Sequence, residues 1–315
     1  MINTDSNKKL ISIVTPCYNE EENVDELCKR VAAVMSTFNY DYEHIFIDNA
    51  SSDNTVKKIK YIAAQDKRIK LIVNARNFGH IRSPYYAMLQ SRGDACISIA
   101  SDLQDPPELI LEFIKKWEEG YKTVLAVKPT SEESSVVFFL RKSYYRFIGK
   151  ISDVPLVQNA TGAGLFDRVV IDILREIQDP YPYFRGLVCE IGFPIATVPF
   201  NQPGRQRGVT KNNFYTLYDI AMLGITNHSK MPLRLMAMGG FLLSLLSLIV
   251  AIGFFMSKIL FWNSFQLGAA PMLIGIFFFG AVQTFFIGVL GEYIGSIHTQ
   301  VRKFPLVVEA ERINF

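Results

Sequence analysis

The chain has 315 residues, 49% of them hydrophobic, and a formal net charge of +3 at pH 7. So small a charge does not indicate nucleic-acid binding, and we expect no nucleic acid among the partners of this protein. The four cysteines lack the spacing of a metal site. We expect them to be reduced thiols of a cytosolic domain, most of them in the core. The length allows one sizeable core and a further, separate part.

Strand-length apolar runs and helical stretches alternate between residues 11 and 127. The expected strands cover residues 11–16, 42–48, 69–74, 95–100 and 121–127. The expected helices lie near residues 21–37, 53–65 and 80–92, with a fourth after Pro106 and Pro107. This alternation predicts an α/β domain with a mostly parallel sheet and helices on its faces. Ligands of such sheets bind at the carboxyl ends of the strands.

Acidic and amide side chains follow the fourth expected strand, where residues 101–108 read SDLQDPPE. Asp102, Gln104 and Asp105 place hard oxygen ligands at this strand end, which predicts a site for a divalent cation that holds a diphosphate. The alternative is a solvated turn whose acidic residues and proline pair only start the next helix.

Basic residues accompany apolar ones in the second half of the domain. A helix near residues 134–150 is expected to lie on a membrane surface, and another near 212–229 leads to the C-terminal part. Between them lie a glycine-containing segment at 159–168, a short helix near 168–178 and the stretch 182–193. The basic groups are Arg141, Lys142, Arg146 and Lys150, then Arg205, Arg207 and Lys211. They indicate contact with anionic head groups or a phosphorylated lipid, or else ordinary solvated helix faces.

Two stretches without charge, residues 235–257 and 271–291, are each long enough to cross the hydrocarbon core of a bilayer. Cations lie before the first stretch and after the second, whereas the connector holds only Lys258. Because positively charged flanks stay in the cytoplasm, we expect both termini and the whole preceding domain on that side. We expect no secretory signal peptide, since residues 1–9 are polar.

Six motifs follow one another along the chain. They are TPCYNEEENV (15–24), IDNASSDNT (47–55), NARNFGH (74–80), SDLQDPPE (101–108), FRG (184–186) and GVTK (208–211). Together with the two apolar stretches, they resemble the polyprenyl-phosphate glycosyltransferases of glycosyltransferase family 2, close to bactoprenol glucosyltransferases and dolichol-phosphate mannose synthases. The resemblance implies a GT-A (Rossmann-like) domain, a nucleotide-diphosphate sugar such as a UDP-sugar, Mg²⁺ or Mn²⁺, and inverting transfer of one sugar to a polyprenyl phosphate such as undecaprenyl phosphate.

The resemblance also implies roles for single residues. Asp102 and Gln104 would bind the metal and, with Arg141, form the catalytic set. The donor would be bound by Pro16, Tyr18, Asn19, Glu20, Asp48, Arg76, Asn77, Gly79, Ser101 and Asp102. The acceptor phosphate would be bound by Arg141, Lys142, Tyr145, Arg205 and Lys211. As an alternative to donor binding, residues 18–20 form a loop and a helix cap. Likewise, a turn alone would explain Asn77 and Gly79.

Four positions depart from the pattern of that family. Ala100 stands where the family usually has a first metal-side Asp, and Asn49 stands where a second base-recognising Asp is frequent. Gly162 occupies a place often held by Asp, so no catalytic role transfers to it. Tyr145 stands where relatives often have a serine. Either its hydroxyl substitutes for that of the serine, or the side chain serves only for packing.

The resemblance and the apolar stretches together predict a membrane-bound inverting glycosyltransferase of the inner membrane, multi-pass, with glucose as the default sugar, for modification of a cell-surface polysaccharide or lipopolysaccharide. Its expected parts are a flexible N-terminus (1–9), a cytoplasmic GT-A domain (10–211), a juxtamembrane helix (212–230), a transmembrane hairpin (231–298) and a cytoplasmic tail (299–315). Gly239 and Gly240 can permit close helix contact, so a homo-oligomer is a further expectation.

Two other functions remain open from the sequence. A processive polysaccharide synthase shares such a domain but normally carries more spans and a Q-x-x-R-W motif, whereas the tryptophans here are Trp117 and Trp262. The other alternative is an inactive membrane-anchored module that only binds a nucleotide or lipid.

Overall fold

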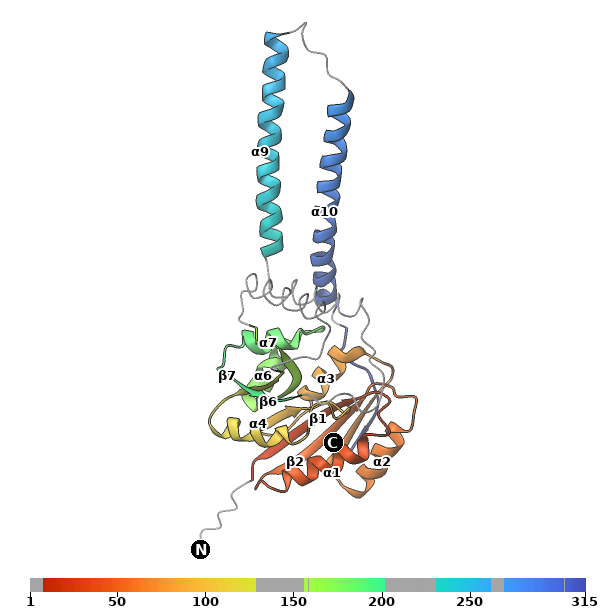
Figure 1. The fold of residues 1–315 in the computed structure, drawn as a ribbon. Helices are drawn as coiled ribbons and strands as arrows, with labels where there is room; N and C mark the ends of the chain where they lie inside the picture. Colours follow the sequence, from red (N-terminus) through yellow and green to blue (C-terminus); the bar gives the residue numbers. More distant parts are fainter. Residues whose placement is uncertain are drawn as a thin grey trace.

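The computed structural model describes residues 8–128, 156–157, 159–201, 222, 231–261, 269–302 and 304–315. These residues form a domain around an eight-stranded sheet and two long helices that extend from it (Figure 1). The strand order is β7-β5-β6-β4-β1-β2-β3-β8. The expected helix at 134–150 lies outside the described residues, and so does the one at 212–229 apart from Met222.

The first four strands run parallel, as the apolar runs predict. They are β1 (Leu10–Cys17), β2 (Asp41–Asp48), β3 (Ile69–Asn74) and β4 (Ala95–Ser98), and β1 lies between β2 and β4. The helices between and after them are α1 (Val24–Met35), α2 (Thr55–Gln65), α3 (Gly79–Leu89) and α4 (Leu109–Glu118). The predicted elements are therefore confirmed, although β4 ends before residue 100. Because the strands are parallel, their carboxyl ends meet at one edge of the sheet.

The other half of the sheet is mixed. The glycine-containing segment forms β6 (Ala160–Asp167), which is antiparallel to both β4 and β5 (Thr123–Val127). β7 (Ile195–Pro199) pairs parallel to β5. The helices here are α6 (Arg168–Ile177), as predicted, and α7 (Phe184–Glu190), within the stretch 182–193. As a result, the carboxyl ends of β4 and β5 and the amino end of β6 lie at the same edge.

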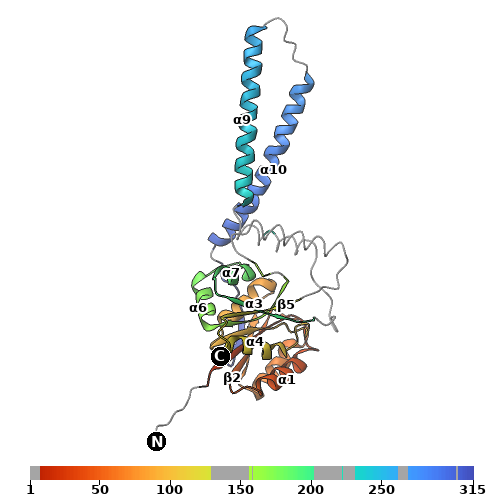
Figure 2. The same cartoon turned by 60° about the vertical axis from the view of Figure 1, so that its left-hand side comes forward.

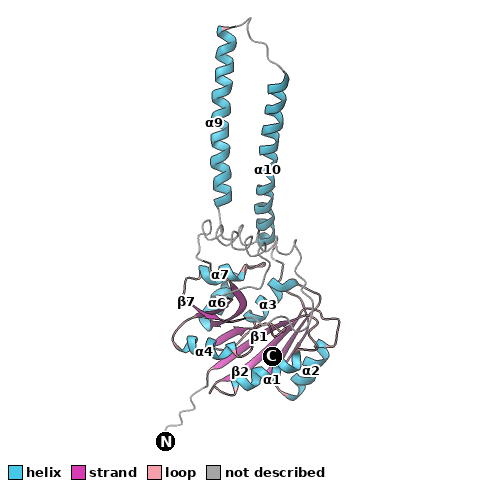
Figure 3. Ribbon diagram, in the orientation of Figure 1, coloured by secondary structure: helices cyan, strands magenta, loops and turns pink. Residues whose placement is uncertain are grey.

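Two apolar layers enclose the sheet, which Figure 3 shows between helices. Neighbouring β1 residues point to opposite layers: Ile13 packs with residues of α1, α2 and α4, whereas Val14 packs with residues of α3, α6 and α7. Both side chains are fully buried. Complete burial of such a side chain stabilises the fold by about 1.5–3 kcal/mol, so the sheet is held from both faces.

Helix α4 shows how the sequence pattern becomes packing. Its buried residues recur at helical spacing, and they are Leu109, Ile110, Phe113, Ile114 and Trp117. The indole Nε1 of Trp117 donates a hydrogen bond of 2.7 Å to Asp167 Oδ2 at the end of β6. The helix that starts after Pro106 and Pro107 therefore connects the loop after β4 to the mixed half of the sheet.

The C-terminal residues return to the domain. We expected a tail after the second apolar helix, whereas Glu309–Ile313 form β8, antiparallel to β3 at the edge of the sheet. The Asn314 side chain then donates hydrogen bonds of 2.7 and 2.8 Å to the carbonyls of Ala63 and Ile69. The end of the chain is thus part of the folded domain.

Two apolar helices, α9 (Met231–Leu260) and α10 (Ala269–Val301), extend away from the domain (Figures 1 and 2). Both are long and apolar enough to cross a membrane: the 18-residue stretches that decide this have a mean hydropathy of 2.4 within Met231–Ser257 and 1.5 within Gly275–Val301, and no part of these two stretches is buried in the protein. A methyl group added at Gly240 of α9 would lie 3.6 Å from the Phe286 ring of α10. The glycine pair therefore allows close contact within this hairpin.

The four cysteines are free thiols, three of them buried, as expected for reduced core residues. Burial raises the pKa of both Cys28 and Cys96 to about 12. Since the thiolate is the reactive form, these two side chains are inert at neutral pH.

Candidate active site

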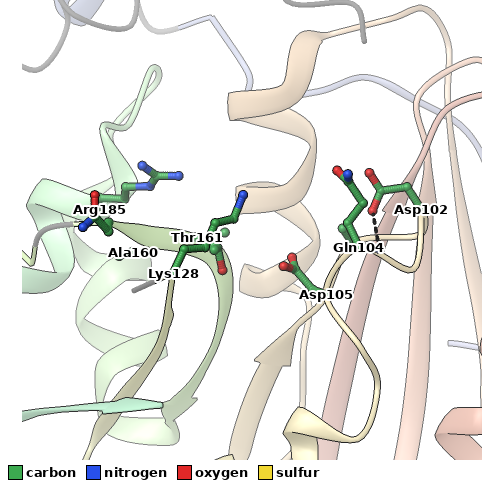
Figure 4. A pocket seen from close by; sticks show the side chains of 10 residues that line it. Asp102, Gln104, Asp105, Lys128, Ala160, Thr161 and Arg185 are labelled. Carbon is green, nitrogen blue, oxygen red and sulfur yellow. Dashed lines mark hydrogen bonds between the residues drawn. The ribbon is translucent and has the colours of Figure 1, made fainter. Parts of the chain in front are cut away.

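The loop after β4 turns sharply between its two candidate metal ligands. Leu103 adopts a left-handed conformation with φ of 56°, which is uncommon for a residue with a branched side chain. The backbone N–H of Gln104 donates a 3.1 Å hydrogen bond to Asp102 Oδ1 (Figure 4). The turn brings Asp102 and Gln104 side by side, with their polar ends on the same side of the loop.

This loop forms one wall of a cavity of about 350 Å³ at the carboxyl edge of the sheet. The other walls come from the residue after β5, the first residues of β6 and the start of α7. The lining residues are Ala100, Asp102, Gln104, Asp105, Lys128, Asn159, Ala160, Thr161, Gly162 and Arg185. Ala100 and Gly162, two of the positions that depart from the family pattern, therefore both face this cavity.

Opposite charges line opposite sides of the cavity. Asp102, Gln104 and the buried Asp105 lie on one side, and Lys128 and Arg185 lie across from them (Figure 4). Lys128 directly follows β5, and its backbone N–H donates a 3.1 Å hydrogen bond to the Asn159 carbonyl before β6. The cavity can therefore receive a cation on one side and an anion on the other.

The donor set of the acidic side suits a hard divalent cation. It offers the carboxylates of Asp102 and Asp105 and the amide oxygen of Gln104, and Mg²⁺ and Mn²⁺ prefer such oxygen ligands. Within the described residues, no group of three or more His, Cys, Asp or Glu is placed to hold a metal. Asp102 and Gln104 fit an ion that also takes waters and substrate phosphates, as Mg²⁺ does in phosphate sites.

The loops after β1 and β2 are joined by hydrogen bonds. The Asn19 N–H donates to Ser51 Oγ (2.9 Å), and the Ser52 N–H donates back to Asn19 Oδ1 (2.8 Å). The Glu20 N–H donates to Thr55 Oγ1 (2.8 Å). Pro16 and Tyr18 are partly buried beside them. The structure thus brings the first two donor motifs together and gives Asn19 a structural role.

Asp48 is fully buried at the end of β2. Its carboxylate accepts hydrogen bonds from the backbone N–H of Ser51 (2.9 Å) and from the Ser51 hydroxyl. Burial raises the pKa of Asp48 above its ordinary value, and the Ser51 hydrogen bonds oppose this shift. The residue expected to recognise the base therefore also shapes its own loop.

The loop after β3 joins the same edge through amide side chains. The Asn49 amide donates a 2.8 Å hydrogen bond to Asn77 Oδ1, and Asn77 Oδ1 also accepts from the Gly79 N–H at 2.8 Å. Gly79 has φ of 86°, which favours glycine. The Arg76 guanidinium lies 4.2 Å from the Phe78 ring centroid. Asn77 and Gly79 thus form the turn that the alternative interpretation predicts, next to Arg76.

The predicted acceptor residues Arg141, Lys142, Tyr145, Arg205 and Lys211 lie outside the described residues. The predicted donor residues at the ends of β1 and β2 and in the segments after β1 and β3 lie at the carboxyl edge but do not line the cavity, whereas Asp102 and Gln104 do. Sequence reasoning assigned no role to Lys128 or Arg185. The FRG motif at 184–186 was a signal for Arg185, but Lys128 had none beyond its place after a strand.

Comparison with known proteins decides the family. The family model described as Glycosyl transferase family 2 matches residues 12–170, which include β1 to β6 and the carboxylate loop. The chain belongs to this family. The α/β domain is its GT-A-like fold, and the protein is a glycosyltransferase.

Relatives of this family-2 glycosyltransferase cover nearly its whole length. An uncharacterised glycosyltransferase of Synechocystis sp. is 33% identical over 96% of this chain and 95% of its own. The bactoprenol glucosyl transferase of Shigella phage SfII is 32% identical over 94% of this chain and 96% of its own. Among solved structures, glucosyl-3-phosphoglycerate synthase from Mycobacterium tuberculosis has a TM-score of 0.45 at 18% identity, covering 69% of this chain and 78% of that chain.

Proposed function

We propose that this glycosyltransferase moves one sugar from a nucleotide-diphosphate sugar to a polyprenyl phosphate, with glucose as the default sugar. The observation that carries the proposal is the cavity, which sets a carboxylate loop against two cations in a domain attached to two apolar helices. Relatives named bactoprenol glucosyl transferase, matching over 94% of this chain, support the same acceptor class.

The chemistry suits a cavity without an obvious general base. A phosphate monoester has a second pKa of about 6, so it is largely a dianion at neutral pH and needs no base to attack a sugar. Gly162, in a place often held by Asp, is therefore compatible with activity. A bound divalent cation supplies Lewis-acid stabilisation of the leaving diphosphate, and Asp102 and Gln104 would hold it.

The remaining task of the protein is to position both substrates. The water-soluble donor reaches the carboxyl edge from the cytoplasm, whereas the polyprenyl tail of the acceptor stays in the bilayer. Arg141 and Lys142 remain the proposed ligands of the acceptor phosphate, since arginine forms bidentate hydrogen bonds with phosphate. Holding the two reactants in line replaces a slow encounter in solution.

We further propose that α9 and α10 cross the inner membrane and that the domain lies at its cytoplasmic face. The cations that flank the hairpin support this orientation, because positive flanks stay in the cytoplasm. In such an arrangement the membrane anchor keeps the site beside the lipid substrate.

The proposal is tested with the purified full-length protein, undecaprenyl phosphate and a panel of nucleotide sugars, with Mg²⁺ or Mn²⁺. Mass spectrometry of the lipid fraction should show one added sugar with one donor, and chelation of the metal should abolish the product. A parallel reaction with undecaprenol, which lacks the phosphate, is the control and should give none. Absence of transfer from every donor would favour the inactive binding module, and long sugar chains would favour a processive synthase.

A further inference from the structure

Arg185 is an exposed residue in the first turn of α7, and its side chain lines the cavity. The four residues that follow, Gly186, Leu187, Val188 and Cys189, are buried and fix the helix against the sheet. In Figure 4 the guanidinium extends from this helix into the space that separates it from Asp102 and Gln104. The backbone is thus held rigidly while the charged group faces an open volume.

The two arginines of α6, a helix that packs on the same face of the sheet as α7, are engaged by the protein. Arg168 donates to the Gly93 carbonyl at 2.7 Å, and Arg175 donates to the Leu89 carbonyl at 2.9 Å and to Asp172 at 2.6 Å. The side chain of Arg185, in contrast, makes no hydrogen bond or ion pair with any residue that the structure describes. Its five donors therefore remain available to a ligand of the cavity.

The chemistry of the cavity points to an anion at this side. Lys128 and Arg185 supply positive charge opposite Asp102, and a guanidinium matches the oxygens of a phosphate in a bidentate manner. In the proposed reaction two phosphate groups are candidates, the diphosphate of the donor and the phosphate monoester of the acceptor. The donor diphosphate belongs with the cation held by Asp102, on the other side.

The direction of attack distinguishes these two candidates. Inversion requires the acceptor phosphate to approach the anomeric carbon from the side opposite the leaving diphosphate. The wall that carries Arg185 is the one opposite Asp102 (Figure 4). In addition, α7 lies at the end of the domain nearest the apolar hairpin, where a lipid-borne phosphate arrives (Figures 1 and 2).

We propose that Arg185 binds the phosphate monoester of the acceptor, an inference that rests on the proposed function. It adds to the Arg141 and Lys142 pair a residue held by a buried helix at the wall of the cavity. Arg185 takes part in no proton transfer. Its side chain orients the nucleophile and neutralises part of its charge.

The test compares Arg185→Ala and Arg185→Lys with wild type as purified full-length proteins. The acceptor KM is measured by varying undecaprenyl phosphate at saturating donor. The donor KM is measured by varying the nucleotide sugar at saturating undecaprenyl phosphate. We expect the acceptor KM of Arg185→Ala to rise about 10- to 100-fold, because a charge-assisted hydrogen bond is lost, while the donor KM stays unchanged. The acceptor KM of Arg185→Lys should lie between those of wild type and Arg185→Ala, since lysine keeps the charge but not the bidentate geometry.

The matched control is Arg92→Ala, an exposed arginine before β4 at the opposite edge of the sheet, which should change neither KM. An unchanged acceptor KM in Arg185→Ala would overturn the inference. A raised donor KM, with weaker binding of UDP and Mn²⁺ by calorimetry, would assign Arg185 to the donor diphosphate and would overturn it as well.

A binding measurement keeps this inference separate from the proposed function. Calorimetry with farnesyl phosphate, a short soluble polyprenyl phosphate, needs no turnover and should show about 10-fold or more weaker binding by Arg185→Ala than by wild type or Arg92→Ala. If wild type transfers no sugar, the proposed function fails. If wild type and Arg185→Ala bind farnesyl phosphate equally, or neither binds it, the inference about Arg185 fails.

Discussion

The side chain of Asp102 links the local sequence to the chemistry of this protein. A left-handed turn at Leu103 sets it beside Gln104, and both face cations across a cavity of about 350 Å³. Backbone conformations of this kind persist only where the surroundings stabilise them, and they cluster at functional sites. We therefore propose that Asp102 is the main ligand of a cation on the acidic side.

We predict that Asp102→Ala lowers turnover at saturating donor by at least about 100-fold. Loss of a residue that only hydrogen-bonds to a metal ligand already lowers metal affinity or activity by about 10- to 100-fold, and loss of a ligand itself should cost more. Steady-state assays with Mg²⁺ and Mn²⁺ measure this loss. The control is Asp41→Ala, an exposed carboxylate at the first residue of β2, which should retain activity. Near-normal turnover in Asp102→Ala would contradict the metal assignment.

His44 makes the stability of the domain depend on pH. It is fully buried in β2, its Nε2 lies 2.9 Å from Thr15 Oγ1, and burial lowers its pKa to about 3. In the unfolded chain the same imidazole has its ordinary pKa of about 6.5, so between these values the unfolded state binds more protons. The stability of the folded state should therefore be greatest above pH 6.5 and should fall as the pH is lowered from there towards 3.

The measurement is thermal unfolding of the detergent-solubilised protein between pH 7.5 and pH 5. His44→Gln retains a polar atom near Thr15 but has no titrating group, so its melting temperature should fall less on acidification than that of wild type. An identical slope for the two proteins would show that other groups carry the pH dependence.

At the scale of elements, β6 and β8 are the antiparallel strands that border the four parallel strands β4, β1, β2 and β3. β6 approaches β5 so closely that glycine is required at one position. A methyl group added at Gly164 would lie 2.5 Å from the Val124 carbonyl, whereas one added at Gly162, on the same strand, meets nothing within 4 Å. The two glycines thus form a matched pair with opposite expectations.

Gly164→Ala should destabilise the domain by about 1–3 kcal/mol, because the backbone of β5 or β6 must shift. Gly162→Ala should leave stability nearly unchanged. Chemical or thermal unfolding of the two purified variants measures the difference. Equal stabilities would show that β5 and β6 leave room for a methyl group at Gly164.

The C-terminal strand is predicted to contribute to stability through its final turn. Asn314 has φ of 62° and donates two hydrogen bonds to main-chain carbonyls. Asn314→Ala should cost about 1–3 kcal/mol, since it removes both bonds and leaves their acceptors unpaired. Asn314→Gly accepts the positive φ without strain, so it isolates the loss of the bonds. An unchanged melting temperature in Asn314→Ala would exclude this role for the residue.

At the scale of the whole molecule, the chain leaves the domain, forms the apolar hairpin and returns. β1 and β8 belong to one sheet, so the segments before and after the hairpin lie on the same side of any membrane it crosses. Gln300, near the end of α10, donates a 2.9 Å hydrogen bond to Asp179 of the domain. The domain is therefore tied to the hairpin through α10 as well as through the chain before α9.

We predict that the connector at residues 258–270 faces the outside of the inner membrane and that both termini face the cytoplasm. Alkaline phosphatase, which is active only outside the cytoplasm, should be active when inserted in the connector and inactive at either terminus. Green fluorescent protein at the C-terminus should fluoresce, since it folds in the cytoplasm. An active phosphatase at a terminus would reverse the proposed orientation.

The sequence alone predicted the elements whose signal is local. β1 to β5, α1 to α4, α6 and the two apolar helices follow from apolar periodicity, and the carboxylate loop follows from residues adjacent in the chain. β6 lacks a comparable signal, because its small residues are selected by the strands beside it. β8 is short and rich in charge, and its pairing with β3 joins residues that are far apart in the chain.

The sequence by itself thus determined the family, the parallel core of the sheet and the place of Asp102 and Gln104 at a strand end. Only the tertiary structure decided which residues face that loop, because Lys128 and Arg185 reach the cavity from β5 and α7, across an antiparallel strand. The physical reason is that the local sequence pattern depends on the burial and backbone conformation of each residue. Which residues face each other across a cavity depends instead on how elements distant in the chain pack together.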